Sequence, residues 1–345
     1  MECLSALIET ANPSIAVRVK TEILRQPLAP GEWETYAPMI AREKTLQTVL
    51  SWQNSGGYFS ERLHTPPSNS KVWSHEGCVR YLLEKGFAAD YEPLGRSLSV
   101  MLESGWGREC EGSAAAAAFG HGIIRASLFA QAGLCDYDFI SEWIERAVQS
   151  FRYIADAVGY EDVAALNRGK YAFIGEKRLP TVYSMRMLAF TDGWRTPENM
   201  DMMEVAFRKL YEWLPIPPTY IKAKSRLIAP LGTICRPFNR DLTEQDGYPW
   251  FQFYEMAARM GVLGAAPFAA HLDRLMERIA ASGGWFAEDY GKAGYIGWSG
   301  YSGIALEDGW KIHKNRINDF TFRCHLIHAL AKNALPAGKS RARLE

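Results

Sequence analysis

Two stretches of the chain end in the same kind of turn: Gln53-Asn54-Ser55-Gly56-Gly57-Tyr58-Phe59 and Ala281-Ser282-Gly283-Gly284-Trp285-Phe286. Each follows a helical pattern and reads Gly-Gly-aromatic-Phe, and Ser104-Gly105-Trp106-Gly107 is a weaker copy. Glycine permits the positive φ of a helix C-cap, while the aromatic ring behind it can pack under the next helical hairpin. Unrelated helix caps would also contain glycine, but repeats at about hairpin spacing favour a stack of helical hairpins, an open or closed α-solenoid.

The spacing of apolar residues predicts helices along most of the chain. Leu46, Val49 and Leu50 follow i, i+3, i+4 spacing, and Asn12-Pro13-Ser14 separates two short N-terminal helices. Strand signals are almost absent, because the β-branched residues do not alternate with polar ones. The sequence therefore predicts an all-α protein, with further helices over 2–10, 14–24, 72–85, 91–103, 113–131, 136–156, 181–189, 197–213, 249–262, 266–281 and 318–335.

The connections between these helices alternate between short and long. Every second connection in a stack of antiparallel hairpins lies at the same end, so we expect the long ones to gather on one face, where functional loops tend to sit. The long connections are 53–71, 104–112, 158–180, 214–248 and 282–317, and the short ones are 86–90, 132–135, 191–196 and 263–265.

The composition excludes several classes of protein. The 345 residues include 39 Lys and Arg against 39 Asp and Glu, so no basic excess is available to neutralise the phosphates of a nucleic acid. The apolar runs are short and broken by charge, which argues against a membrane span. The N-terminus shows no basic region before an apolar stretch, and the six cysteines are scattered singly. We therefore expect reduced thiols in a cytoplasmic protein without a signal peptide.

Together with the Gly-Gly-aromatic turns, four stretches carry a resemblance to a known superfamily. The chain resembles the squalene–hopene cyclase and protein prenyltransferase superfamily, and in particular bacterial prenyltransferase-like or squalene-cyclase-like repeat proteins of similar length. The resemblance implies a single (α/α)6 toroid domain over 1–345, with 1–30 as an N-terminal helical hairpin that packs on or completes the ring. The stretches are Asn12-Pro13-Ser14-Ile15-Ala16-Val17-Arg18, His121-Gly122-Ile123-Ile124-Arg125-Ala126-Ser127-Leu128, Tyr248-Pro249-Trp250-Phe251-Gln252-Phe253-Tyr254-Glu255 and Arg316-Ile317-Asn318-Asp319-Phe320-Thr321-Phe322-Arg323.

The chain also departs from that superfamily at its catalytic motifs. The acidic DxDD motif of the cyclases is missing, and Asp136-Tyr137-Asp138-Phe139 is better explained by helix N-capping. Cys324 and His328 could form half of a prenyltransferase zinc site, but no clear third ligand follows. Ala118 and Thr181 replace cysteine and histidine positions of the bacterial relatives. We therefore expect no metal and no cofactor.

In a toroid the inner helices line a central cavity, and their N-terminal ends carry our candidate catalytic residues. Glu255 follows an apolar, aromatic run, where desolvation would raise the pKa of its carboxyl toward neutral. His75 and His121 stand at two other helix entrances and can change protonation near neutral pH. Aromatic residues are expected to bind the substrate there, with glycine-rich segment 290–301 as a lid: Trp73, Phe119, Tyr183, Trp250, Phe253, Tyr254, Tyr295, Trp298 and Phe320.

Structural roles remain the alternative for each catalytic candidate. Glu255 could pair with an arginine such as Arg236 or Arg259, and either histidine could be a hydrogen-bonded core residue. The expected function is a terpene-cyclase-like isomerase, cyclase or lyase that moves a proton on a small or medium hydrophobic, isoprenoid-like molecule. One alternative is a non-catalytic scaffold or ligand-binding toroid. Another is a carbohydrate hydrolase or lyase with Glu255 and Asp319, or Glu307 and Asp308, as paired carboxylates. The oligomeric state is left open.

Overall fold

The computed structural model describes residues 2–64, 73–104, 106, 115–288, 290, 304–309 and 311–333, without the side chains of 115–119. The chain forms two compact units, and each is described by itself. Unit 1 consists of 1–104, 242–255 and 272–333, and unit 2 consists of 105–241, 256–271 and 334–345. The sequence predicts one toroid domain over 1–345 and does not predict the boundaries between these two units. No helix in the described ranges is long and apolar enough to cross a membrane.

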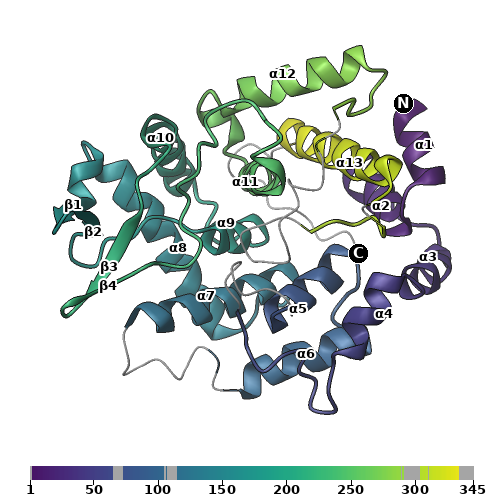
Figure 1. The fold of residues 1–345 in the computed structure, drawn as a ribbon, viewed down its shortest axis with the longest axis horizontal. Coiled ribbons are helices and arrows are strands. Elements are labelled where there is room, and N and C mark those ends of the chain that lie inside the picture. The colour runs from purple at the N-terminus through teal and green to yellow at the C-terminus, as the bar shows by residue number, and fades with distance from the viewer. Residues whose placement is uncertain are drawn as a thin grey trace. The chain divides into compact units, whose positions relative to one another are not determined.

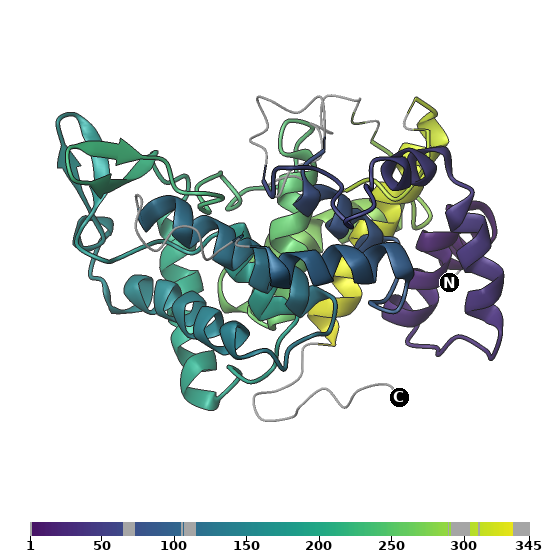
Figure 2. The ribbon, with the colours of Figure 1, turned by 90° about the horizontal axis from the view of Figure 1, so that it is seen from below.

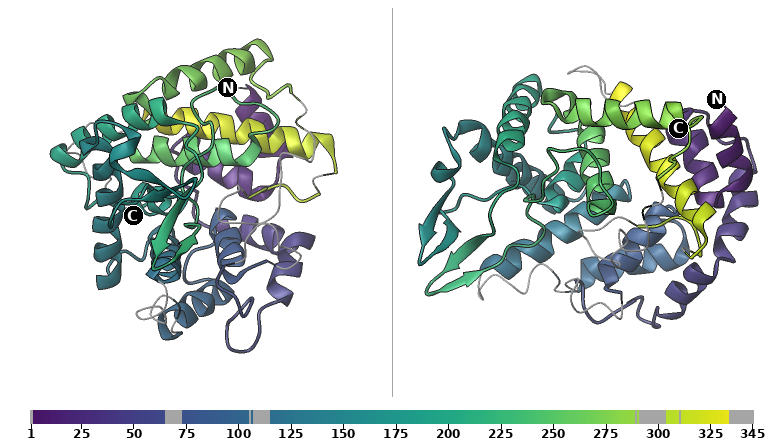
Figure 3. Two further views of the ribbon diagram at one scale, coloured as in Figure 1. Left: turned by 60° about the vertical axis from the view of Figure 1, so that its left-hand side comes forward. Right: turned by 45° about the horizontal axis from the view of Figure 1, so that its top comes forward.

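Unit 1 is built from short N-terminal helices and the long C-terminal helix. Asn12 caps α2 by accepting a 2.9 Å hydrogen bond from the backbone N–H of Ser14, and Pro13 starts the helix. The purple N-terminal helices lie side by side in Figure 2, and Figure 3 shows the yellow α13 beside them, where it packs against η1. The helices are α1 (Glu2–Thr10), α2 (Pro13–Arg18), the π-helix η1 (Val19–Ile23), α3 (Glu32–Ala41), α4 (Lys44–Ser51), α5 (His75–Glu84), α6 (Glu92–Glu103) and α13 (His313–Lys332).

Unit 2 is built around four helices, with two further helices shared with unit 1. Helix α8 packs along α10, where the rings of Phe151 and Phe207 stack with centroids 5.5 Å apart. The side chain of Thr196 caps α10 and Pro197 starts it. The helices are α7 (Ala115–Gln131), α8 (Asp138–Asp156), α9 (Val182–Ala189) and α10 (Pro197–Trp213), the short η3 (Tyr160–Asp162) and η4 (Leu263–Ala265), and the shared α11 (Gly247–Met260) and α12 (Phe268–Ala281).

A mixed four-stranded sheet in unit 2 overturns the all-α prediction (Figure 1). Strands β1 (Ala164–Asn167) and β2 (Lys170–Phe173) form one antiparallel hairpin, and β3 (Thr219–Ala223) and β4 (Arg226–Ile228) form another. The hairpins join through β2 and β3, which run parallel with Tyr171 opposite Thr219. The prediction of an all-α (α/α)6 toroid with long loops on one face is therefore wrong: helices make up 58% of the described residues, and two of the expected loops contain the strands.

The strands escaped prediction because they are three to five residues long and their partners come from distant segments. Their burial does not alternate cleanly, since β1 has one buried, two exposed and one half-buried position. The backbone at the turn of the first hairpin shows its turn type. Arg168 and Gly169 both have positive φ, 52° and 79°, the combination that a type I′ hairpin turn requires.

The helices themselves follow the sequence pattern closely. The expected ranges 2–10 and 197–213 coincide with α1 and α10, whereas α3 was not expected and contains Pro38. Both Gly-Gly-aromatic turns have the positive φ that the pattern predicted, 86° at Gly57 and 94° at Gly284. A Cβ at Gly284 would stand 2.8 Å from the Cβ of Cys3, so glycine there also permits a close approach to α1.

Candidate functional site

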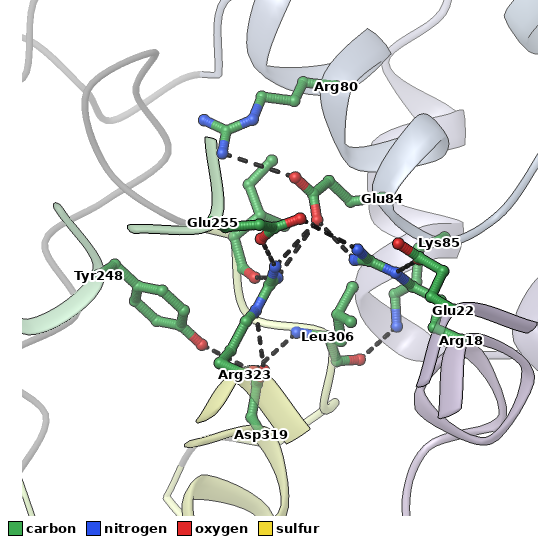
Figure 4. A network of polar contacts seen from close by, with 11 residues as sticks. Arg18, Glu22, Arg80, Glu84, Lys85, Tyr248, Glu255, Leu306, Asp319 and Arg323 are labelled. Carbon is green, nitrogen blue, oxygen red and sulfur yellow. Dashed lines mark hydrogen bonds and ion pairs between the residues drawn. The ribbon is translucent and has the colours of Figure 1, made fainter. Parts of the chain in front are cut away.

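Four buried charged residues from four helices form a ring in the core of unit 1. Arg18 donates from Nη1 to Glu84 Oε2 (2.9 Å) and from Nη2 to Glu255 Oε1 (3.3 Å). Arg323 donates from Nη1 to Glu255 Oε2 (3.0 Å) and from Nη2 to Glu84 Oε2 (3.3 Å). Each carboxylate therefore contacts both guanidinium groups, and Figure 4 shows the four side chains pointing toward one another.

The ring keeps its charges although water is excluded from it. Burial alone would lower the pKa of Arg323, but the carboxylates of Glu84 and Glu255 raise it above its ordinary value. The pKa of Arg18 is also raised, because its carboxylate neighbours outweigh burial. Charges removed from water in this way need close opposite partners, and here each has at least two. The ring therefore ties α2, α5, α11 and α13 together within unit 1.

Glu255 was our first candidate for an acid or base, but in the structure it is one of the two carboxylates of this ring. Both of its carboxylate oxygens accept from arginines, and its side chain is 4% exposed. The alternative interpretation, a structural carboxylate paired with arginine, describes this geometry, although its partners are Arg18 and Arg323 instead of Arg236 or Arg259. Its position suits a charge that holds helices together better than one that exchanges a proton with a substrate.

His75 is also committed to the backbone of unit 1. Its Nδ1 accepts from the N–H of Phe59 at 3.2 Å, and its Nε2 lies 3.2 Å from the carbonyl oxygen of Ser97, to which it can donate. Burial lowers the pKa of His75 to about 4. The imidazole is therefore neutral at physiological pH, with its proton on Nε2, and it links the start of α5 to the loop of Phe59 and to helix α6.

The third candidate, His121, lies in unit 2 on α7 and is half-buried. The sequence placed His75, His121 and Glu255 at equivalent positions of three hairpins. That equivalence assumed the toroid fold, and it has no basis because the toroid prediction is wrong.

Most of the predicted substrate-binding aromatics in unit 1 pack against one another. Trp250 and Tyr254 stack with their centroids 3.5 Å apart, and Phe253 is buried beside Tyr254. Phe320 is buried among other rings of the same unit, Tyr248, Phe251, Phe286 and Tyr290. These side chains fill the core of unit 1 as a close-packed aromatic cluster.

The remaining aromatics have different surroundings. Tyr183 is buried in unit 2 on α9, with the guanidinium of Arg186 5.5 Å from its ring centroid. Trp73 is half-buried and touches Trp52 and Tyr81 edge to face, at 5.2 and 5.5 Å. The side chain of Phe119, as well as Tyr295 and Trp298 with most of the expected lid, lies outside the described residues.

A different carboxyl, Glu307, has the properties expected of an acid or base. Its Oε1 accepts from the backbone N–H of Asn12 at 3.1 Å and from Nδ2 of Asn318 at 2.8 Å. Burial raises the pKa of Glu307 to about 7, against the weaker opposing effect of these hydrogen bonds. The residue is 9% exposed, so little water reaches its side chain. From the sequence, Glu307 was expected only as a partner of Asp308 in a pair of carboxylates that could act on a carbohydrate.

The groups beside Glu307 are also buried and ionisable. Lys85 Nζ contacts the carboxylate of Glu43, the carbonyl of Leu306 and, at 3.3 Å, Asn12 Oδ1. Burial lowers the pKa of Lys85. Asp319 accepts from the hydroxyl of Tyr248 at 2.7 Å and from the N–H of Leu306 at 2.9 Å, and burial raises its pKa (Figure 4).

A row of aromatic side chains links Lys85 to two half-buried tryptophans. Lys85 Nζ lies 5.5 Å from the ring centroid of Tyr81, and Tyr81 touches Trp73. Trp73 and its neighbour Trp52 are both half-buried, so their rings offer apolar surface that water reaches. We call Glu307, Lys85, Asn12, Asn318, Tyr81 and Trp73 the Glu307 cluster.

Other chemistry that the sequence raised finds no geometric support in the described ranges. These residues contain no group of three or more His, Cys, Asp or Glu side chains placed to hold a metal ion. Cys324 is buried, and burial raises the pKa of its thiol. Asp308, the proposed partner of Glu307, accepts from the N–H of Lys44 at 3.0 Å and from the hydroxyl of Thr45, so it is occupied at the start of α4.

A pocket in unit 2 lies under the sheet, but it is small. Its volume is about 10 Å³, roughly the room that one water molecule needs. It is lined mainly by apolar side chains of α7, the strands and their loops, among them Ile123, Phe173, Leu179, Ile221 and Leu231.

No protein-family model, no curated protein and no solved structure matches this chain. The resemblance to the cyclase and prenyltransferase superfamily therefore stays an interpretation of the sequence, and the function must be argued from the geometry of the two units.

Proposed function

We propose that the protein is an enzyme that moves a proton on a small, largely apolar molecule, with Glu307 as the acid and base. The observation that carries this proposal is the pKa of Glu307, about 7, in a carboxyl held by two N–H donors. A group whose pKa lies near the working pH can both give and take a proton at a useful rate. This function keeps the reaction class expected from the sequence but moves its centre from Glu255 to Glu307.

The two oxygens of Glu307 have different tasks in this proposal. Oε1 is fixed as a hydrogen-bond acceptor by Asn12 and Asn318, which orients the carboxyl group. The proton is therefore exchanged at Oε2, which has no hydrogen-bond partner among the described residues. Lys85 contributes positive charge nearby, which would stabilise negative charge that develops on the substrate. Tyr81, Trp73 and Trp52 supply the apolar surface for it.

Isomerisation of a β,γ-unsaturated ketone such as cyclohex-3-enone tests this proposal. A carboxylate can take the α proton of this ketone and return it to the γ carbon, giving the conjugated enone, which absorbs in the ultraviolet. The wild-type protein should catalyse the reaction, and Glu307→Gln should slow it by about 10²-fold, the usual contribution of one acid or base. Glu9→Gln changes an exposed residue of the same unit and should have no effect. Equal rates for the wild type and Glu307→Gln would overturn the assignment.

A second candidate, a non-catalytic protein, is favoured by one specific observation. Both nitrogens of His75 and both carboxylate oxygens of Glu255 make hydrogen bonds within unit 1, which is typical of residues that stabilise a fold. This alternative predicts that Glu307→Gln leaves every ligand affinity intact and stabilises the fold, because it removes the cost of a buried ionisable group.

A further inference from the structure

Unit 2 contains a chain of three polar side chains that neither proposal uses. Tyr211 lies near the end of α10, His271 on α12, and Asp241 in the loop before α11. The hydroxyl of Tyr211 lies 3.1 Å from Nε2 of His271, and Nδ1 of His271 lies 2.5 Å from Oδ1 of Asp241. A carboxylate can only accept, so Nδ1 carries the proton and Nε2 is left to accept from Tyr211.

The surroundings hold these three side chains in place. Asn239 Nδ2 donates to the backbone carbonyls of Tyr211 (3.0 Å) and Leu214 (2.7 Å), which ties the loop of Asp241 to the end of α10. The ring of Phe268 contacts Tyr211 edge to face, with centroids 4.9 Å apart. Tyr211 is half-buried, the side chain of His271 is 9% exposed, and that of Asp241 is 42% exposed. The phenol is thus both positioned and accessible.

We propose that Asp241, His271 and Tyr211 form a nucleophilic acyl-transfer site, in which Tyr211 takes an acyl group from an activated ester. The order carboxylate, imidazole, hydroxyl is that of a general-base-activated nucleophile, with tyrosine as the hydroxyl. Tyr211 is the catalytic residue and His271 its base. Asp241 is a positioning residue, because it acts by holding the proton on Nδ1.

The step balances without any further reactant. Tyr211 Oη forms a bond to the acyl carbon while its proton moves to His271 Nε2, and the bond from that carbon to the leaving oxygen or sulfur breaks. The leaving group then takes the proton from His271. A phenol is a better leaving group than an alkyl alcohol, so transfer to Tyr211 is favourable from aryl esters or thioesters and unfavourable from alkyl esters. The substrate class is therefore an activated ester of a carboxylic acid.

Acetylation by p-nitrophenyl acetate, located by peptide mass spectrometry, tests the site. Tyr211 of the full chain should be acetylated at least about tenfold faster than Tyr137, which is 39% exposed and whose ring contacts those of Phe129 and Phe139. His271→Gln and Asp241→Asn should each slow labelling of Tyr211 by about tenfold or more and leave Tyr137 unchanged. Labelling of Tyr211 at the rate of Tyr137, or unaffected by His271→Gln, would overturn the proposal.

The tautomer of His271 separates this role from a merely structural one. In the wild type, ¹⁵N NMR should place the ring proton on Nδ1. In Asp241→Asn the amide can donate to Nδ1, which moves the ring proton to Nε2 and removes the acceptor that Tyr211 needs. Asp241 is partly exposed, so this variant should keep its fold by circular dichroism. A folded Asp241→Asn protein with unchanged labelling of Tyr211 would also contradict the relay.

Discussion

Asn318 Nδ2 donates a 2.8 Å hydrogen bond to Oε1 of Glu307 across the start of the C-terminal helix. Both residues are buried, at 1% and 9% exposure, so water competes little for this contact. The hydrogen bond favours the ionised carboxylate and opposes the effect of burial on its pKa. Asn318 therefore sets how close to neutral the pKa of Glu307 lies.

Replacing Asn318 with leucine should raise the pKa of Glu307 above about 7. The substitution removes a hydrogen bond that favours the ionised carboxylate, while the effect of burial, which favours the protonated form, remains. The measurement is a ¹³C NMR titration of the carboxyl carbons of labelled glutamate. Asn315→Leu is the matched control in the same helix, since Asn315 donates to the backbone carbonyl of Asp308 and to no carboxylate. A pKa of Glu307 that falls or stays unchanged in Asn318→Leu would refute this role.

The stability that Glu307 contributes should decrease as the pH rises. Its pKa is about 7 in the folded protein against 4.5 as the ordinary value, so between these pH values the folded state keeps a proton that the unfolded state has lost. This stabilisation is complete below pH 4.5 and disappears through pH 7. Relative to Glu307→Gln, the free energy of unfolding of the wild type should fall by up to about 3 kcal/mol over this window. Urea unfolding at several pH values measures it, and a rising difference would contradict it.

Loss of Arg323 should destabilise unit 1 strongly. Arg323→Met leaves Glu84 and Glu255 buried with one guanidinium fewer, and breaking such a buried pair typically costs about 3–5 kcal/mol. Arg96→Met is the control, because the ion pair of Arg96 with Glu92 is exposed and should contribute less than about 1 kcal/mol. Urea denaturation compares the two variants. An equal, small loss in both would show that the buried ring does not hold the helices together.

The second Gly-Gly-aromatic turn should tolerate alanine at one glycine and not at the other. Gly283 and Gly284 both have positive φ, at 66° and 94°, but only the Cβ at Gly284 would meet another atom, 2.8 Å away on Cys3. Gly283→Ala should cost about 1 kcal/mol for the backbone, and Gly284→Ala should cost more because α1 must also shift. Thermal unfolding of the two variants tests the order, and the reverse order would refute the steric argument.

Local patterns in the sequence predicted most of the helices, but they did not predict the sheet. The ranges of α1 and α10 could be predicted to the residue, because Asn12-Pro13 follows the end of α1 and Thr196-Pro197 marks the start of α10. The sheet could not, since the pairing of Tyr171 with Thr219 joins strands about fifty residues apart that carry no clear alternation. Tertiary pairing, instead of local propensity, made these segments strands.

The same limit applies to the candidate site. Glu255 was identified from its aromatic surroundings, but Arg18, which neutralises it, lies 237 positions away in the sequence. The burial of Glu307 also depends on distant partners, since Asn12 comes from the other end of the chain. A sequence shows that a carboxyl follows an apolar run, whereas only the fold shows which cations and donors face it. That difference decides whether its pKa shifts toward neutral.

The titration of the Glu307 carboxyl tests the central claim most directly. In ¹³C-labelled wild-type protein, one glutamate carboxyl should titrate near pH 7, and this resonance should be missing from Glu307→Gln while the others stay unchanged. If every glutamate carboxyl of the wild type instead titrates below about pH 5, the range of ordinary glutamates, then Glu307 is a permanent carboxylate and the proposed acid–base chemistry is wrong.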